Sequence, residues 1–118
     1  MKTYRDLIVW QKSVHFVTVI YQTTKTFPKD EVFGLISQMR RCSVSIPSNI
    51  AEGYGRRSKK DYLRFLQIAM GAVYELQTQI EISRNLEYLT PNRIEEIYQL
   101  SREIERMLSS LINKVRDK

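Results

Sequence analysis

The chain has 118 residues, of which 42% are hydrophobic, and this length fits one domain spanning residues 1–118. Three Pro and four Gly are too few for a disordered chain or a turn-rich β-sandwich, so long helices are expected. The net charge of +6 favours an anionic partner such as RNA or DNA.

A first helix is predicted from Leu7, where apolar residues recur at intervals of three and four. Such spacing places them on one stripe of a helix. The helix is expected to end near Phe27, because a residue before a proline is pushed out of the helical region. The stripe consists of Leu7, Trp10, Val14, Val17 and Tyr21.

A second helix is expected to open at Asp30 and Glu31, because carboxylates are favourable in a first helical turn. Its apolar stripe is Leu35, Met39, Cys42 and Ile46. Pro47 removes one backbone donor, which predicts a kink rather than a stop, and the glycines at 53 and 55 then end the helix.

The third and longest helix is predicted from a cap at Ser58, supported by Asp61, to about Leu86. Its main stripe is Tyr62, Leu66, Ala69, Val73, Leu76 and Ile80. Further apolar residues widen that stripe: Leu63, Phe65, Ile68, Met70, Ala72 and Ile82. Two interpretations stay open, a wide core-facing surface or a second face that meets another subunit, and we favour a homo-oligomer.

Thr90 as cap and Pro91 at the first helical position predict the start of a last helix. Its apolar face follows the same spacing through Ile94, Ile97, Ser101, Ile104, Leu108, Leu111 and Val115. Because short connections between long helices favour antiparallel neighbours, we predict an all-α fold, an antiparallel up-down four-helix bundle whose second helix is kinked at Pro47.

No apolar run reaches the length needed to cross a bilayer, so no membrane partner is expected. Residues 1–12 lack the long uncharged core of a signal peptide, which predicts a cytoplasmic protein.

Few residue types suited to catalysis are present. His15 is the only histidine and Cys42 the only cysteine, so neither a histidine-pair metal site nor a histidine-paired nucleophile is expected in one chain. The glycines near 53–57 lack the pattern of a nucleotide-cofactor loop. We therefore predict a non-enzyme without cofactor or metal, in which Asn49, Glu52 and Glu75 form an interior polar network.

Residues 40–64 hold seven of the 19 Lys and Arg residues against two acids. Within them, GYGRRSKK at 53–60 places four cations on a turn before a helix, where phosphate is attracted. Arg56 and Arg57 offer forked donors, Lys59 and Lys60 mobile charges, and Tyr54 a ring for stacking on a base. Arg40, Arg41 and Arg64 are expected to extend this patch. The alternative is a solvated loop.

Two functions follow from these features. The first is a non-enzymatic homo-oligomer that binds the backbone of RNA or DNA through the basic turn and helix start. The second is a protein-interaction scaffold without affinity for nucleic acid, whose positive charge recognises an acidic protein.

Several motifs resemble one family closely: DLIVWQK at 6–12, IYQTTKTFP at 20–28, SIPSNIAEGYGR at 45–56 and FLQIAMGAVYELQTQIEIS at 65–83. The chain resembles the four-helix-bundle proteins of the 23S ribosomal RNA intervening-sequence family. This resemblance implies an antiparallel bundle, often a ring-like homopentamer, in bacterial cytoplasm.

A related branch of that family, the accessory variability protein of diversity-generating retroelements, engages nucleic acid and a reverse transcriptase through a basic pentamer surface. The resemblance therefore implies nucleic acid, and an enzyme acting on it, as partners. It supplies no catalytic residues. The matching motif positions, whose implied role is to shape the kinked helix and the turn, are Pro47, Asn49, Glu52, Gly53, Gly55 and Arg56.

Overall fold

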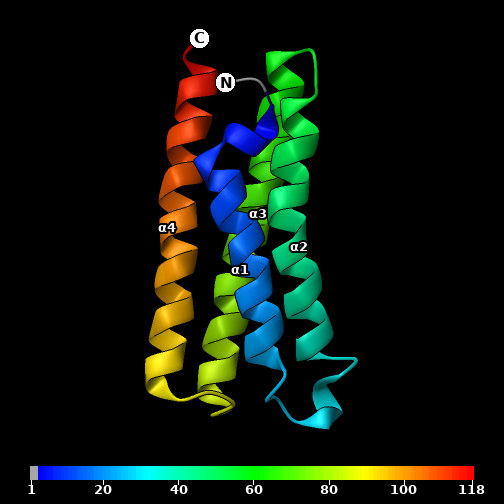
Figure 1. Cartoon of the computed structure of the whole chain (residues 1–118), viewed down its shortest axis with the longest axis vertical. Coiled ribbons are helices and arrows are strands. Elements are labelled where there is room, and N and C mark those ends of the chain that lie inside the picture. Colours follow the sequence, from blue (N-terminus) through cyan, green and yellow to red (C-terminus); the bar gives the residue numbers. More distant parts are fainter. Residues whose placement is uncertain (1–2) are drawn as a thin grey trace.

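Four helices run alternately up and down along a rod of 45 × 25 × 20 Å (Figure 1). The structure is a computed structural model, and it describes residues 3–118. Residues 1 and 2 of the segment 1–12, which is predicted to lack a signal-peptide core, lie outside that range. The long helices are α1 (Ile8–Thr24), α2 (Leu35–Tyr54), α3 (Lys59–Asn85) and α4 (Pro91–Arg116), with short 3-10 helices η1 (Tyr4–Asp6) and η2 (Lys29–Glu31). The predicted all-α, antiparallel up-down bundle is confirmed.

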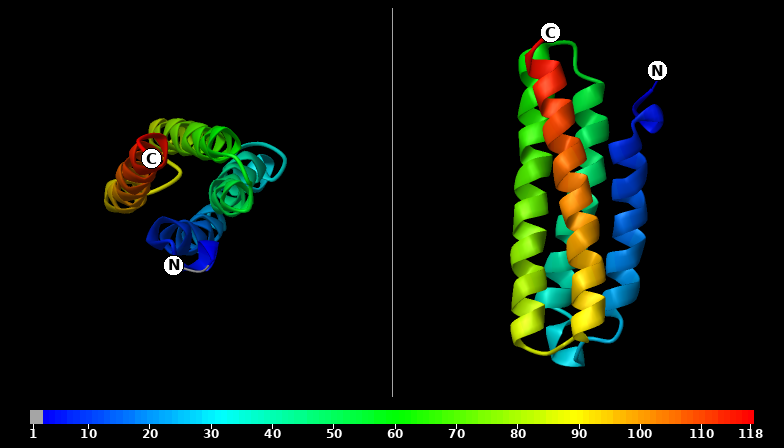
Figure 2. Two further views of the ribbon diagram at one scale, coloured as in Figure 1. Left: turned by 90° about the horizontal axis from the view of Figure 1, so that it is seen from above. Right: turned by 90° about the vertical axis from the view of Figure 1, so that its left-hand side faces the viewer.

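Each helix packs against the next along the chain, and α4 closes the bundle against α1 (Figure 2). Packing is most extensive between α2 and α3 and least extensive between α1 and α4. The α2–α3 turn and the end of α4 lie at one end of the rod, whereas the α1–α2 and α3–α4 connections lie at the other (Figure 1). Surfaces at the two ends are thus separated by the length of the helices.

The residues of α1 that face the core differ from those predicted. Val14 and Tyr21 of the predicted stripe are each 40% exposed. The hydroxyl of Ser13 is buried and donates to the Val9 carbonyl over 2.7 Å. Because a hydroxyl that bonds within its own helix tolerates burial, polar residues share the core face and an apolar pattern misplaces it. The buried residues of α1 are Val9, Ser13, Phe16, Val19, Ile20, Thr23 and Thr24.

The predicted start of α2 at residues 30 and 31 is also wrong. These residues belong to η2, and α2 begins at Leu35. Oε1 of Glu31 accepts a 3.0 Å hydrogen bond from the Leu35 N–H, so the acid caps α2 from the preceding turn. Gly34 leaves room for this carboxylate, since a Cβ there would lie 2.6 Å from Oε1.

Helix α2 continues through the buried Pro47 to Tyr54 rather than stopping, as predicted. Its stripe residues Leu35, Met39, Cys42 and Ile46 are all buried.

The predicted starts of α3 and α4 are confirmed. Ser58 Oγ accepts from the Asp61 N–H (3.0 Å), and Thr90 Oγ1 accepts from the Arg93 N–H (3.2 Å). On α3, Ile68 and Ile82 stay 44% and 42% exposed, so part of its wide apolar surface lies outside the core. None of the helices within residues 3–118 has an apolar stretch sufficient to span a membrane.

Candidate nucleic-acid interface

The α2–α3 turn depends on a close approach of the two helices just before it. A Cβ on the buried Gly53 would lie 2.6 Å from the Cβ of Phe65 and 3.2 Å from a ring carbon of Tyr62. Only glycine permits this contact, and the chain then reverses through residues 55–58 into α3. The turn therefore presents its charged side chains at a position fixed by helix packing.

Two arginines, one on each side of this turn, share one aromatic ring. The guanidinium carbon of Arg56 lies 4.7 Å from the ring centroid of Phe65, and that of Arg64 lies 4.6 Å from it. Both distances are within the range of cation–π attraction. Arg56 also donates through Nη2 to Glu52 Oε2 at 3.0 Å. The structure thus brings together two cations that are eight positions apart in the sequence.

Lys59 has a partner that the sequence did not reveal. Its Nζ donates to the backbone oxygens of Arg116, at 2.9 Å, and of Lys118. An ammonium at the carboxyl end of a helix is favourable, because carbonyls there lack partners and the helix dipole is negative. Lys59 therefore joins the start of α3 to the end of α4 instead of being the mobile charge predicted.

This contact places the end of α4 beside the turn. A shallow pocket of about 290 Å³ lies between them. Its charged lining residues are Arg56, Arg57, Lys59 and Lys118, and no acidic residue lines it. The basic surface thus draws on the turn, on α3 and on α4.

Arg57 and Lys60 are exposed, and the side chain of neither forms a hydrogen bond or ion pair with any other residue in the range 3–118. Their charges are available to an incoming anion without breaking an existing contact. We define the turn surface as Arg56, Arg57, Lys60 and Arg64, the four cations here whose side chains do not hold the end of α4.

Tyr54 is half-buried rather than projecting from the turn. Its ring lies 6.0 Å from that of Tyr62 at an interplanar angle of 85°, an edge-to-face contact. Burial raises the pKa of Tyr62, and the neighbouring Tyr54 adds to this. Tyr54 therefore takes part in helix packing, and its stacking on a base stays a prediction.

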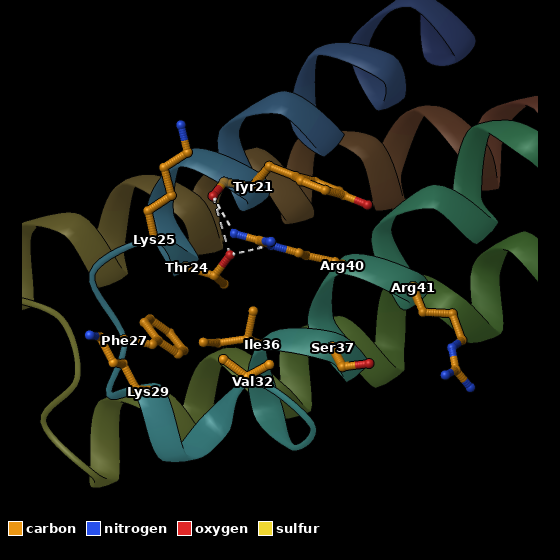
Figure 3. Close-up of a pocket in the computed structure, with 10 residues that line it drawn as sticks. All are labelled: Tyr21, Thr24, Lys25, Phe27, Lys29, Val32, Ile36, Ser37, Arg40 and Arg41. Atoms are coloured by element: carbon orange, nitrogen blue, oxygen red, sulfur yellow. Dashed lines mark hydrogen bonds between the residues drawn. The ribbon is translucent and has the colours of Figure 1, made fainter.

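Arg40 and Arg41 do not lie at the turn surface. Arg40 lies 14 positions before Tyr54, the last residue of α2, which is a rise of about 21 Å along the helix. They line a separate groove near the α1–α2 connection (Figure 3). The predicted single patch is therefore divided between the two ends of the rod.

The predicted interior polar network is wrong. Glu52 and Glu75 are both exposed, on the flanks of their helices. Asn49 is half-buried and donates to the Ser45 carbonyl within α2, at 2.7 Å. Carboxylates avoid the core because burial penalises their charge, and the buried polar positions are taken by Ser and Thr hydroxyls and by the neutral amide of Gln79.

The residue types of catalysis are poorly placed for it. Cys42 is buried and donates to the Ala72 carbonyl at 3.0 Å. Burial, together with the charge of Glu75, raises the pKa of the Cys42 thiol to about 12, which disfavours the nucleophilic thiolate. His15 is exposed, and among residues 3–118 no group of three or more His, Cys, Asp and Glu side chains is arranged to hold a metal.

Comparison with known proteins gives a family and a fold. Residues 5–110 match the family model described as 23S rRNA-intervening sequence protein. A solved structure, the crystal structure of a protein with unknown function from the S23 ribosomal protein family of Bacteroides thetaiotaomicron VPI-5482, is 30% identical with a TM-score of 0.80. The alignment covers 89% of this chain and 98% of that one. No curated protein matches the sequence.

Proposed function

The chain belongs to the 23S rRNA-intervening sequence protein family, and from that premise we propose that it is a non-enzymatic protein that binds the backbone of RNA or DNA. The turn surface is the binding site. The observation that carries this proposal is the pair of guanidiniums held over one Phe65 ring, next to Arg57 and Lys60, whose side chains have no hydrogen-bond or ion-pair partner among residues 3–118.

The turn surface suits phosphate binding because two of its arginines, Arg56 and Arg64, are already held in place before the ligand arrives. Arginine presents planar, forked donors that match phosphate oxygens, and holding it on a ring reduces the entropy lost on binding. Arg57 and Lys60 add charges whose partners in the free protein are water and counterions. Phosphates that replace those counterions gain affinity in a salt-dependent way without requiring base-specific contacts.

We further propose that the protein works in the cytoplasm as a homo-oligomer, a pentamer by family resemblance. The exposed apolar side chains Ile68, Tyr74 and Ile82 on α3 support subunit contacts. An assembly would repeat the turn surface once per subunit. Each added copy would contribute to avidity for a long polyanion.

A specific observation also favours the second candidate function, a protein-interaction scaffold. Phe33 is 96% exposed and Val32 48% exposed in the α1–α2 connection. An aromatic side chain in that position is typical of a contact with another protein. A nucleic-acid enzyme such as a reverse transcriptase is a partner consistent with either function. Capture from nuclease-treated extract separates the two, because a protein partner survives digestion.

The deciding experiment measures binding to single-stranded RNA, duplex RNA and duplex DNA at two salt concentrations, with the mass of the assembly recorded in the same samples. The test variant replaces Arg56, Arg57, Lys60 and Arg64 with Gln and leaves Lys59 in place to hold α4. The control variant makes the same change of charge away from the turn, at Lys12, Arg84, Arg102 and Arg106.

We expect the affinity of the unchanged protein to fall by roughly 10³-fold or more from low to moderate salt if six to ten phosphates are contacted. The test variant should lose most of this affinity, with the salt slope reduced by about one per contact removed, whereas the control variant should keep it. Equal binding by the test variant and the unchanged protein would overturn the assignment.

A further inference from the structure

A second basic site lies at the opposite end of the rod, in a groove of about 590 Å³ between the end of α1, the α1–α2 connection and the first turns of α2 (Figure 3). Its cations are Lys25, Lys29, Arg40 and Arg41, and no acidic residue lines it. None of these four forms an ion pair with a carboxylate within residues 3–118. In Figure 3 the guanidinium of Arg40 lies in the groove, whereas the charged ends of Lys25, Lys29 and Arg41 point away from it.

Arg40 is the most constrained of the four. Its Nε donates to Thr24 Oγ1 at 3.0 Å and its Nη2 donates to the Tyr21 carbonyl at 3.2 Å. Its guanidinium carbon also lies 4.6 Å from the Tyr21 ring centroid. These bonds use two of the five N–H donors of the guanidinium, and both acceptors are neutral. The side chain is therefore fixed in place while its charge and three donors remain for a ligand.

This arrangement differs from that of the arginines that form ion pairs with glutamates. Arg84, Arg93 and Arg102 each pair with a nearby glutamate on their own helix, and Arg56 in the turn pairs with Glu52 of α2. Arg40 is half-buried and lacks such a glutamate. A partly desolvated charge is costly without an opposite charge beside it, so an anion seated in the groove would stabilise this side chain.

The opposite wall of the groove is apolar. Phe27, Val32 and Ile36 lie across from the arginine in Figure 3. The volume falls within the range of small-molecule sites, which combine apolar walls with a few polar groups that orient the ligand. A simple inorganic anion would use the cations alone, whereas a ligand with both an anionic group and an apolar body would use both walls.

We propose that this groove binds the phosphate of a nucleotide-sized ligand, with Arg40 on the phosphate, the three other cations adding to its long-range attraction, and the base against the apolar wall. A phosphate monoester concentrates nearly two negative charges on three acceptor oxygens, which suits the forked donors of Arg40 and the surrounding positive charge better than a single carboxylate does. The ligand is either a free nucleotide, which carries such a monoester, or one nucleotide of a strand, whose phosphodiester offers one negative charge and two free oxygens. The proposal uses residues separate from the turn surface and does not depend on the function proposed there.

The test is calorimetric titration of the full chain with AMP, inorganic phosphate, a short single-stranded RNA and an acidic peptide. The variants are Arg40→Gln, Arg41→Gln and Arg40→Lys, with Arg84→Gln as a control of equal charge. The Arg41 side chain forms no hydrogen bond or ion pair with another residue in the range 3–118, so its variant remains informative if Arg40→Gln unfolds. Thermal unfolding checks that each protein is folded.

We expect AMP to bind more tightly than inorganic phosphate. Arg40→Gln should weaken AMP binding by about tenfold or more, the range for a charge-assisted hydrogen bond, and Arg41→Gln should weaken it by a smaller factor through the loss of a nearby positive charge. Arg40→Lys should recover part of the affinity because it keeps the charge without the fork. Arg84→Gln should bind as the unchanged protein does.

A second outcome also supports the proposal: the unchanged protein binds RNA but not AMP, and the groove substitutions abolish that RNA binding. The nucleotide would then belong to a strand. Three results would overturn it: no binding of AMP or RNA at the groove, binding of the acidic peptide alone, or equal weakening by Arg84→Gln. Failure at the turn surface would appear separately, since the turn substitutions leave Arg40 and Arg41 unchanged.

Discussion

The Tyr88 hydroxyl donates a 2.7 Å hydrogen bond to Oε2 of Glu31, joining the α3–α4 connection to the α1–α2 connection. The other oxygen of the same carboxylate accepts from the Leu35 N–H at the start of α2. These bonds, first that from Leu35 and then that from Tyr88, lower the pKa of Glu31. One ionised side chain thus holds three segments together at this end of the rod.

Glu31→Gln is expected to lower the midpoint of thermal unfolding at pH 7, because a neutral amide is a weaker acceptor for both donors. The folded-state pKa is lowered, so the stabilisation is present above the ordinary value of 4.5 and is lost as the pH falls through the folded-state value. The difference in unfolding midpoint between the variant and the unchanged protein should therefore become smaller in acid. Tyr88→Phe should reproduce part of the loss, and Glu87→Gln, on an exposed carboxylate, should not. A difference that is constant with pH would contradict this account.

The glycines at 53 and 71 predict opposite effects of the same substitution. Gly53→Ala should destabilise the fold by about 1–3 kcal/mol, because its Cβ would overlap the Phe65 side chain. Gly71→Ala should stabilise it by about 0.5–1 kcal/mol, since a Cβ there has no neighbour within 4 Å and alanine favours helix. Urea unfolding of the two variants checks both signs. Destabilisation by Gly71→Ala would contradict the prediction.

The corrected core face of α1 is tested by two truncations. Phe16 is 1% exposed, so Phe16→Ala should cost about 3–5 kcal/mol of unfolding free energy. Val14 is 40% exposed, and Val14→Ala should change that free energy by about 0.5 kcal/mol or less in the monomer. Denaturant unfolding at low protein concentration makes the comparison. A larger loss of unfolding free energy in Val14→Ala would indicate that Val14 is in the core, as its sequence spacing predicts.

Cys42 should react slowly with alkylating reagents in the folded protein, because its thiol is buried and its pKa is raised to about 12. The folded state favours the neutral thiol over the thiolate. The free energy of unfolding is therefore unaffected by this group below the ordinary thiol pKa of 9.0, and it decreases as the pH rises from there towards 12. Mass spectrometry after timed labelling at pH 8, with and without denaturant, measures the protection. Equal labelling rates in both conditions would show that the thiol is accessible.

Phe65→Leu tests whether the shared ring matters for binding without changing any charge. Loss of a cation–π contact of about 0.5–1 kcal/mol should weaken RNA affinity by about two- to fivefold and leave the salt slope unchanged. The variant keeps an apolar side chain against Gly53, and circular dichroism confirms its helices. A changed salt slope would mean instead that phosphate contacts had been lost.

The parts of the fold that were predictable from the sequence are those specified locally. Ser58 and Thr90 lie close in sequence to the amides that they cap, so the predicted starts of α3 and α4 were correct. The start of α2 was not, because Glu31 caps it from a preceding turn with an irregular backbone. The stripe on α1 was misplaced because hydroxyls bonded within the helix occupy part of the core.

The candidate sites divide in the same way. The cations of the turn surface are nearly continuous in sequence, and their gathering was predicted. The contact of Lys59 with the end of α4 spans 57 residues to Arg116, and no local pattern indicates it. The groove was missed because Lys25 and Lys29 come from one connection and Arg40 and Arg41 from the next helix. Cations on both sides of Pro28 were the available sequence indication.

The sparse packing between α1 and α4 makes this side of the bundle the easiest to open. A groove of about 220 Å³ follows the seam, which the exposed ion pair of Lys12 with Glu103, at 3.1 Å, spans. Exposed pairs contribute little to stability, so α1 is held chiefly by α2. Backbone amides of α1 should therefore exchange with deuterium before those of α3, through partial openings that leave the other three helices assembled.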